Sequence, residues 1–228
     1  MYKTDTLILK DWWDIPIEYH PTNTGIILIN IPGAGGSVGG YMNKYVNLGN
    51  YIQEKNIASF VRISNDRPQE YELTVRTVIN YCLEHSLEIC GSKSPEIWLM
   101  GFSAGGGAIV LAGWEYPEVR KILAINPFIE VRGVRGRLEK NLPSYDGELF
   151  LIKGEDDVVI ASDTLDYISE CAMGASVLES HIIPSCDHQL KGVVNSKILS
   201  QLPEYYFLGK YMVEGFPDGS NGFDLLDS

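Results

Sequence analysis

Positive charge is scarce in this sequence of 228 residues. It has 18 lysine and arginine residues against 30 aspartate and glutamate residues, so its formal net charge is −12 at pH 7. Nucleic acids and anionic membranes bind proteins through cationic faces that displace counterions, and this charge therefore disfavours both as partners. A protein that acts on a small molecule is the remaining expectation.

Cysteine and long apolar runs are also lacking. The four cysteines include no C-x-x-C pair, which predicts reduced thiols and no metal site. No run approaches the roughly 20 apolar residues of a membrane span, and the first residues lack the apolar core of a signal peptide. We therefore expect a cytoplasmic protein without a membrane partner, while its oligomeric state cannot be predicted.

Strand and helix patterns alternate along most of the chain. Continuous apolar runs such as Ile26–Ile29 predict strands that are buried on both faces, as in a parallel sheet covered by helices. The chain is thus expected to be one α/β domain over residues 1–228, with a mostly parallel central sheet, helices on both faces and antiparallel strands at the N-terminus. The predicted strands cover residues 4–10, 15–19, 25–31, 57–63, 96–100, 121–126, 148–153 and 176–183, and the predicted helices 41–55, 69–90, 106–114, 162–173 and a segment from 190.

Two segments interrupt this alternation. Residues 127–147 have no clear period and are predicted to be irregular. The segment 203–228 begins with the aromatic run Tyr205–Phe207 and becomes rich in glycine, aspartate and serine. It is predicted to be a C-terminal tail that docks at first and frays later.

The most informative motif is G-F-S-A-G at residues 101–105. It follows the apolar run 96–100 and precedes a helix pattern of small residues, so it predicts a tight turn between a strand and a helix with Ser103 at the apex. Such a turn exposes the serine hydroxyl, and the flanking glycines let the strand and helix backbones approach each other. This context predicts a nucleophilic serine.

With this motif, the chain resembles the α/β-hydrolase family from Gly25 to the helix after His188. The order of catalytic residues in that family is nucleophile, acid, histidine. A serine hydroxyl needs an imidazole to take its proton, and the imidazole needs a carboxylate that orients it. The resemblance implies neither a metal ion nor an organic cofactor.

The acid is expected in residues 148–159, which resemble the family's strand and the G-x-x-D loop after it. In that loop the aspartate precedes a short apolar pair, here Val158 and Val159. Asp157 is the match. Asp156 takes its place if the register slips by one residue.

The histidine follows by elimination among four. His20 and His85 precede the serine, and His181 lies inside a predicted strand that would fix its side chain. His188 follows that strand in a loop that resembles the D-H pair before the last helix of many family members, so it is predicted as the general base. The neighbouring Asp187 is expected to cap the helix that follows.

An oxyanion intermediate needs hydrogen-bond donors, which backbone amides can supply. The amide of Ala104, directly after the nucleophile, is one candidate. The glycine-rich loop that begins at Pro32 resembles the family's H-G-G-G-type loop, which implies Ala34 as the second donor. Proline stands where histidine is usual, so Gly33 and Gly35 remain alternatives. A phosphate-binding loop is disfavoured because neither common glycine-rich phosphate motif is met.

In this family, the segment at 127–147 often carries the cap over the active site. Here it is too short for a cap domain, so the resemblance implies a short lid-like insertion and an open site. Arg132, Arg135, Arg137 and Lys140 cluster in it. They predict either a solvated face or the recognition of an anionic substrate group by guanidinium.

Four aromatic residues are expected near the serine, with core packing as the alternative for each. They are Tyr41, Tyr45, Phe102 and Phe128. For Phe102, packing is the preferred interpretation. Cys186 lies close to His188 in sequence and is expected to be a structural thiol.

Taken with the resemblance, these residues imply a serine hydrolase that cleaves a small carboxylic ester or thioester through an acyl-enzyme intermediate. Ser103 would attack, His188 would transfer the proton and Asp157 would orient His188. A small peptidase or an acyltransferase with the same triad is an alternative. A ligand-binding receptor that keeps the pocket is another, since a fold constrains the machinery more than the reaction.

Overall fold

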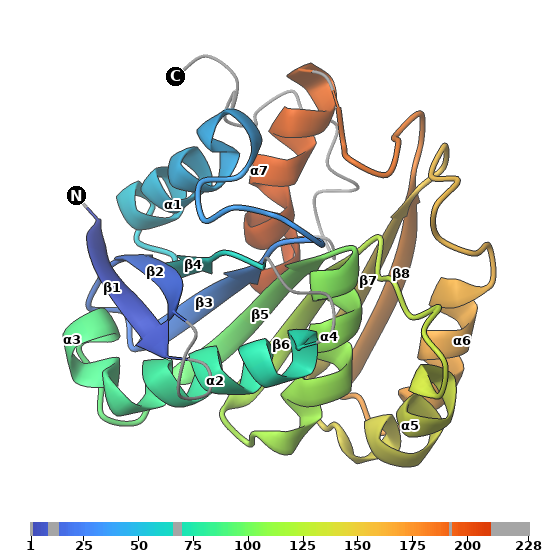
Figure 1. Ribbon diagram of the computed structural model, residues 1–228, viewed down its shortest axis with the longest axis horizontal. Helices are drawn as coiled ribbons and strands as arrows, with labels where there is room; N and C mark the ends of the chain where they lie inside the picture. The colour runs from blue at the N-terminus through green and yellow to red at the C-terminus, as the bar shows by residue number, and fades with distance from the viewer. Residues whose placement is uncertain (1, 9–13, 66–69, 192, 211–228) are drawn as a thin grey trace.

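The computed structural model describes residues 2–8, 14–65, 70–191 and 193–210. Within them, eight strands form one sheet with the order β1-β2-β4-β3-β5-β6-β7-β8 (Figure 1). The strands are β1 Lys3–Ile8, β2 Asp14–His20, β3 Ile26–Ile31, β4 Ser59–Ile63, β5 Glu96–Phe102, β6 Val119–Ile125, β7 Glu148–Gly154 and β8 Val177–Ile183.

Strands β4, β3, β5, β6, β7 and β8 are parallel neighbours, while β2 pairs antiparallel with β4 and β1 antiparallel with β2. In β3, residues 27–31 are all buried, which explains why this strand is apolar without alternation. Ile27, Ile29 and Ile31 belong to the core on one face of the sheet, and Leu28 belongs to the core on the other. The predicted mostly parallel sheet with N-terminal antiparallel strands is confirmed.

Helices cover both faces of this sheet (Figure 1). On one face lie α1 Lys44–Glu54 and α7 Val193–Phe207; on the other lie α2 Tyr71–Glu84, α3 Ser86–Cys90, α4 Ala104–Ala112, α5 Val134–Asn141 and α6 Thr164–Cys171. In α2 the buried residues Val75, Val78, Ile79 and Cys82 recur at helical spacing and form the stripe that packs on the sheet. Among the helices of the described residues, none is long and apolar enough to cross a membrane.

The segment 127–147 differs from its prediction. Residues 134–144 are ordered as α5 and the short 3₁₀ turn η4 Leu142–Ser144, which lie in the crossover from β6 to β7. Val134, Leu138 and Leu142 are buried at intervals of four, so one face of this segment is apolar despite its charges. The prediction of an irregular segment was therefore wrong here, while a lid role for 127–147 remains a prediction.

Two other element boundaries differ from their predictions. The single helix predicted over 69–90 is divided at His85, whose φ of −99° and ψ of 13° lie outside the helical region. The tail predicted from residue 203 begins later, because Pro203–Phe207 is the end of α7 and its aromatic side chains are buried. Residues 211–228, the remaining part of the predicted tail, lie outside the described residues.

The connections place a topological switch point at the carboxyl ends of β3 and β5. These strands are adjacent, but α1 after β3 and α4 after β5 lie on opposite faces of the sheet (Figure 1). The loops that leave the two strands therefore diverge, and open α/β sheets bind ligands at such a switch point. Ser103 follows β5 directly at this point.

Candidate active site

Ser103 lies at the junction of β5 and α4 in a backbone conformation that side-chain-bearing residues rarely adopt. Its φ is 53° and its ψ is −119°. The Ser103 amide donates to the carbonyl of Ile125 (2.9 Å), and its carbonyl accepts from the amides of Gly107 (3.0 Å) and Phe128 (2.9 Å). Strained backbone persists only where its surroundings hold it, and it concentrates at functional sites. Here three hydrogen bonds hold the predicted apex in place.

The turn leaves no room for side chains beside the serine. A Cβ atom on Gly105 would lie 2.3 Å from the carbonyl oxygen of Ile31 and 2.5 Å from that of Pro32. A Cβ atom on Gly101 would lie 2.6 Å from the carbonyl oxygen of Gly105. Both glycines of the motif are thus required by backbone contacts between β3, β5 and α4.

Gly105→Ala should destabilise the fold. The new methyl group meets two backbone carbonyls that cannot rotate away, so we expect the free energy of unfolding to fall by about 1–3 kcal/mol, as in other overpacked cores. Gly136→Ala is the matched control, because a Cβ atom there meets nothing within 4 Å on α5. That variant should gain about 0.5–1 kcal/mol in helix propensity. Urea denaturation measures both, and equal stabilities would contradict the expectation.

The side chains of Ser103, His188 and Asp157 form one hydrogen-bonded chain. His188 Nε2 lies 3.0 Å from Ser103 Oγ, and His188 Nδ1 lies 2.7 Å from Asp157 Oδ2. The other carboxylate oxygen of Asp157 accepts the amides of Val159 (2.7 Å) and Ile160 (3.1 Å). Because both oxygens of this buried carboxylate are occupied, its orientation is fixed toward the imidazole.

The other two aspartates of these loops do not contact His188 through their carboxylates. Asp156 is exposed, and its amide donates to the carbonyl of Cys186 (3.0 Å). Asp187 accepts the amides of Gln189 (3.0 Å) and Lys191 (3.1 Å), which lie in the loop before α7 begins at Val193. These contacts order the loop and do not cap the helix, so the predicted capping role was wrong. The register that selects Asp157 is therefore the one that faces His188.

The other histidines have separate surroundings. His20 is buried, where it accepts a hydrogen bond from Arg62 Nε at 3.3 Å. Burial, together with the nearby charge of Arg62, lowers the pKa of His20 to about 4. His85 stacks on Tyr81 at the end of α2, and the His181 Nδ1 atom in β8 lies 2.5 Å from the hydroxyl of Tyr206. The structure thus brings only His188 of the described histidines to Ser103.

Sequence reasoning missed Asn126, which links the loops that carry the candidate triad. This fully buried residue follows β6, and its Nδ2 atom donates to the carbonyl of His188 (3.0 Å). Its Oδ1 atom accepts the amide of Gly154 (2.8 Å), where the Asp157 loop begins. Its φ of 46° is left-handed, a region that asparagine tolerates better than most residues. An asparagine at the end of a buried strand was the only sequence signal.

Asn126→Ala should lower both stability and turnover. It leaves the Gly154 amide and the His188 carbonyl without their partner, and an unsatisfied buried group costs about 1–3 kcal/mol. We expect a loss of that size in urea denaturation, with kcat reduced more than KM is raised because His188 loses its support. Asn195→Ala removes a similar amide-to-carbonyl bond (2.8 Å to Lys191), but at an exposed site of α7, and should cost less than about 0.5 kcal/mol. Equal losses in the two variants would contradict this role.

The glycine-rich loop is braced by a second residue that sequence reasoning missed, Asn65. Asn65 Nδ2 donates to the carbonyl of Pro32 (2.7 Å), and the Asn65 carbonyl accepts the amide of Gly35 (2.9 Å). Gly35 is therefore a poor candidate for the oxyanion donor. Among the described residues, no acceptor faces the amides of Gly33 and Ala34, and a Cβ atom on Gly33 would lie 3.2 Å from Ser103 Cβ. This geometry is compatible with Ala34, or Gly33, as the donor beside Ala104.

The four predicted aromatic residues do not share one environment. Phe102 is buried with its ring centre 5.8 Å from that of His188, so it packs and borders the site. Phe128 is half-buried, and its amide contacts the Ser103 carbonyl. Tyr45 is buried in α1, whereas Tyr41 is 76% exposed.

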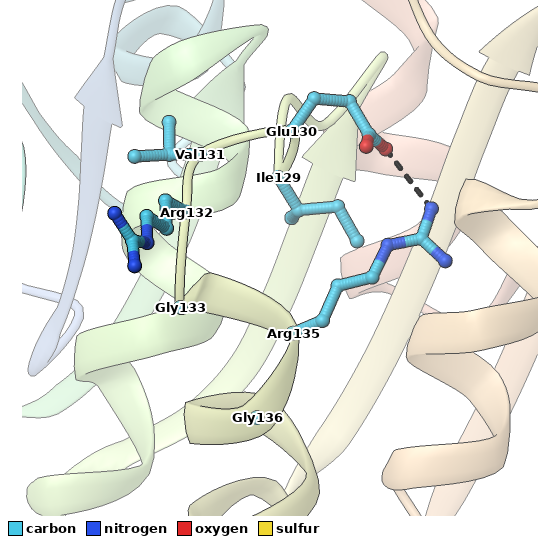
Figure 2. Close-up of a pocket in the computed structure, with 7 residues that line it drawn as sticks. All are labelled: Ile129, Glu130, Val131, Arg132, Gly133, Arg135 and Gly136. Carbon is cyan, nitrogen blue, oxygen red and sulfur yellow. Dashed lines mark hydrogen bonds and ion pairs between the residues drawn. The ribbon is translucent and has the colours of Figure 1, made fainter.

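Two of the four cations in the basic cluster of 132–140 form ion pairs. Arg135 contacts Asp163 (2.8 Å) and Glu130 (3.1 Å), which raises the pKa of its guanidinium, and Arg137 contacts Glu72 (2.6 Å). Arg132 and Arg135 both line a hollow of about 320 Å³. Figure 2 shows their side chains on opposite sides of the backbone. These ion pairs favour the interpretation of the basic cluster as a solvated face that is held by neighbouring carboxylates. Recognition of an anionic group by Arg132 and Arg135 remains a prediction.

Neither thiol nor metal chemistry finds support in the described part of the chain. All four cysteines are buried and free, and burial raises the pKa of the Cys186 thiol to about 12. Among the described residues, no group of three or more His, Cys, Asp and Glu side chains is placed to hold a metal ion.

No protein-family model matches the sequence, and no curated protein is significantly similar to it. Solved structures do resemble the fold. Est1E from Butyrivibrio proteoclasticus superposes with a TM-score of 0.69 at 13% identity, over 92% of this chain and 99% of that one. The dienelactone hydrolase from Anabaena variabilis superposes with a TM-score of 0.68 at 18% identity, over 92% of this chain and 97% of that one. An esterase from Pyrococcus furiosus superposes with a TM-score of 0.70 at 14% identity, over 95% of this chain and 93% of that one.

Proposed function

Since this chain has the α/β-hydrolase fold that its sequence led us to expect, we propose that it is a serine hydrolase acting on a small carboxylic ester or thioester. The observation that carries the proposal is the chain from Ser103 Oγ through His188 to Asp157, with distances of 3.0 and 2.7 Å. These distances support the proposal, because a nucleophile, its base and an orienting acid must lie within hydrogen-bond reach of one another.

In the proposed reaction, Ser103 Oγ attacks the ester carbonyl while His188 Nε2 takes its proton. Asp157 keeps Nδ1 protonated and stabilises the imidazolium that forms. His188 then protonates the leaving alcohol or thiol, and an acyl-Ser103 ester remains. In the second half, water gives a proton to His188 and attacks this ester, which releases the acid and restores Ser103.

The negative charge that develops on the carbonyl oxygen needs donors in place beforehand. The Ala104 amide is in the first turn of α4, where helix amides have no intrahelical acceptor and the helix dipole favours an anion. The proposed second donor is the amide of Ala34. The loss of one such donor costs about 3–4 kcal/mol in the transition state.

An ester is the substrate class that we favour. The similar structures include proteins described as esterases and a dienelactone hydrolase, which supports this class. The segment 127–147 spans too few residues for a cap domain, so a compact substrate in an open site fits the chain.

Labelling with a fluorophosphonate probe tests the nucleophile, and a panel of short-chain esters and thioesters tests the reaction. We expect covalent modification that mass spectrometry maps to the peptide with Ser103, and turnover well beyond one product per protein. If the probe labels Ser103 but each protein molecule forms only one product, the chain is instead a ligand-binding receptor that keeps the pocket. If Ser103 stays unmodified and no ester or amide is cleaved, the proposal is wrong.

A further inference from the structure

Lys44, the first residue of α1, has its ammonium beside the candidate active site. Its Nζ atom lies 5.2 Å from the ring centre of Phe102 and 5.1 Å from that of Tyr45. Phe102 directly precedes Ser103, and its ring is the neighbour of His188 described above. The ammonium, at 5.2 Å, and the imidazole, at 5.8 Å, thus both neighbour the same aromatic ring.

The position of Lys44 is built into the loop that carries the candidate oxyanion donor. A Cβ atom on Gly40 would lie 2.9 Å from Lys44 Cγ and 2.6 Å from Tyr45 Cδ2, so the lysine stem packs against this loop. Gly40 has a φ of 70°, and its amide is tied to the Ser37 carbonyl at 3.0 Å. A stem packed against backbone leaves the ammonium little freedom to move away.

Lys44 also lacks the carboxylate partner that half of the lysine and arginine residues in the described part of the chain have. Among the described residues, no carboxylate pairs with it, whereas Arg76, Arg120, Arg135 and Arg137 all do. Burial lowers the pKa of the Lys44 ammonium, with no opposing charge. A half-buried cation that only aromatic rings face is poorly compensated, because each ring contributes about 0.5–2 kcal/mol.

We propose that Lys44 binds a carboxylate carried by the substrate, so that the site prefers anionic esters to neutral ones. This inference rests on the proposed function, and it assigns anion recognition to a residue that contacts the Phe102 ring instead of to the arginines of 132–140. An entering carboxylate would replace the missing partner of the ammonium in a place where water screens the charges only partly.

Two pairs of stable esters of matched shape test this inference. Ethyl hydrogen succinate, with its anion in the acyl part, is paired with ethyl 4-methylpentanoate; butyryloxyacetate, with its anion in the alcohol part, is paired with isobutyl butyrate. A pH-stat gives kcat/KM for each, and the measured quantity is the anionic-to-neutral ratio within each pair. We expect a ratio above one in at least one pair, falling as salt is added because the contact is screened.

In that pair, Lys44→Met and Lys44→Gln should lower the ratio by about 10- to 100-fold, the loss expected for a charge-assisted hydrogen bond. Lys44→Arg should retain most of the parent protein's anionic-to-neutral ratio. Lys55→Met is the matched control, because Lys55 lies over the Tyr51 ring (5.7 Å) at the other end of α1. This control should leave the ratio unchanged.

Two results would overturn the inference in distinguishable ways. If the parent protein cleaves the neutral esters but both Lys44 variants keep its ratio, Lys44 does not bind the substrate and the proposed function stands. If the parent cleaves none of the esters and Ser103 is not labelled, the proposed function fails and this inference with it.

Discussion

Ser103→Ala is expected to reduce kcat/KM for ester hydrolysis by about 10⁴- to 10⁶-fold, to the residual rate that oxyanion donors and binding alone provide. The change removes a single oxygen atom, the proposed nucleophile, which lies 3.0 Å from His188 Nε2. Alanine tolerates the left-handed backbone about as well as serine, so the fold should persist. Steady-state rates on an activated ester and a urea melt measure the two effects.

Ser185→Ala is the matched control for this variant. Ser185 also has a φ of 53° and lies in the loop before His188, but none of the hydrogen bonds found for it involves its hydroxyl. Near-parent activity of Ser103→Ala would remove Ser103 from the mechanism. The Ser103→Ala, His188→Ala double variant should be little worse than either single variant, because the two residues act as one unit. Additive losses would mean that they work separately.

Asp157→Asn is expected to reduce kcat by about 10³- to 10⁴-fold, while Asp156→Asn stays within a few-fold of the parent protein. The two substitutions remove the same charge from adjacent positions. Only Asp157 contacts His188, at 2.7 Å, and an amide in its place can present an N–H to the imidazole and favour the wrong tautomer. Asparagine has the shape of aspartate, so the loss should come from the chemistry.

The ranking of these two variants is the decisive result. Rates are compared at a single pH with both proteins shown to be folded by circular dichroism. A larger loss in Asp156→Asn would place the acid one residue earlier than the structure does. Small losses in both would mean that His188 needs no carboxylate.

Much of the fold and the turn that carries Ser103 could be predicted from the sequence, because their signals are local. The apolar run before Ser103 and the glycines around it determine a strand, a turn and a helix within about fifteen residues. Asp157 and His188 were predicted from their order after Ser103 and from the resemblance of their loops to those of α/β-hydrolases. The fold that the resemblance implied is confirmed, while the catalytic roles remain for the variants above to test.

Helix α5 shows where local signals misled. The segment 127–147 was predicted to be irregular because it has no clear period, although Val134, Leu138 and Leu142 lie at helical spacing. Helix formation there depends on packing against the sheet and its neighbours, because a helix of this length is marginal on its own. The partners of its arginines, Glu72 and Asp163, come from α2 and from the residue before α6, so the sequence did not indicate which charges were free.

The sequence by itself thus determined the alternation of strands and helices, the turn at Ser103 and the candidates for base and acid. Tertiary structure decided which side chains hold these candidates in place. Asn126 and Asn65 each join segments that are distant in sequence, and Lys44 reaches the site only because α1 packs beside the loop after β3. Such contacts leave no periodic or local pattern in the chain, because they depend on which strands the sheet makes neighbours.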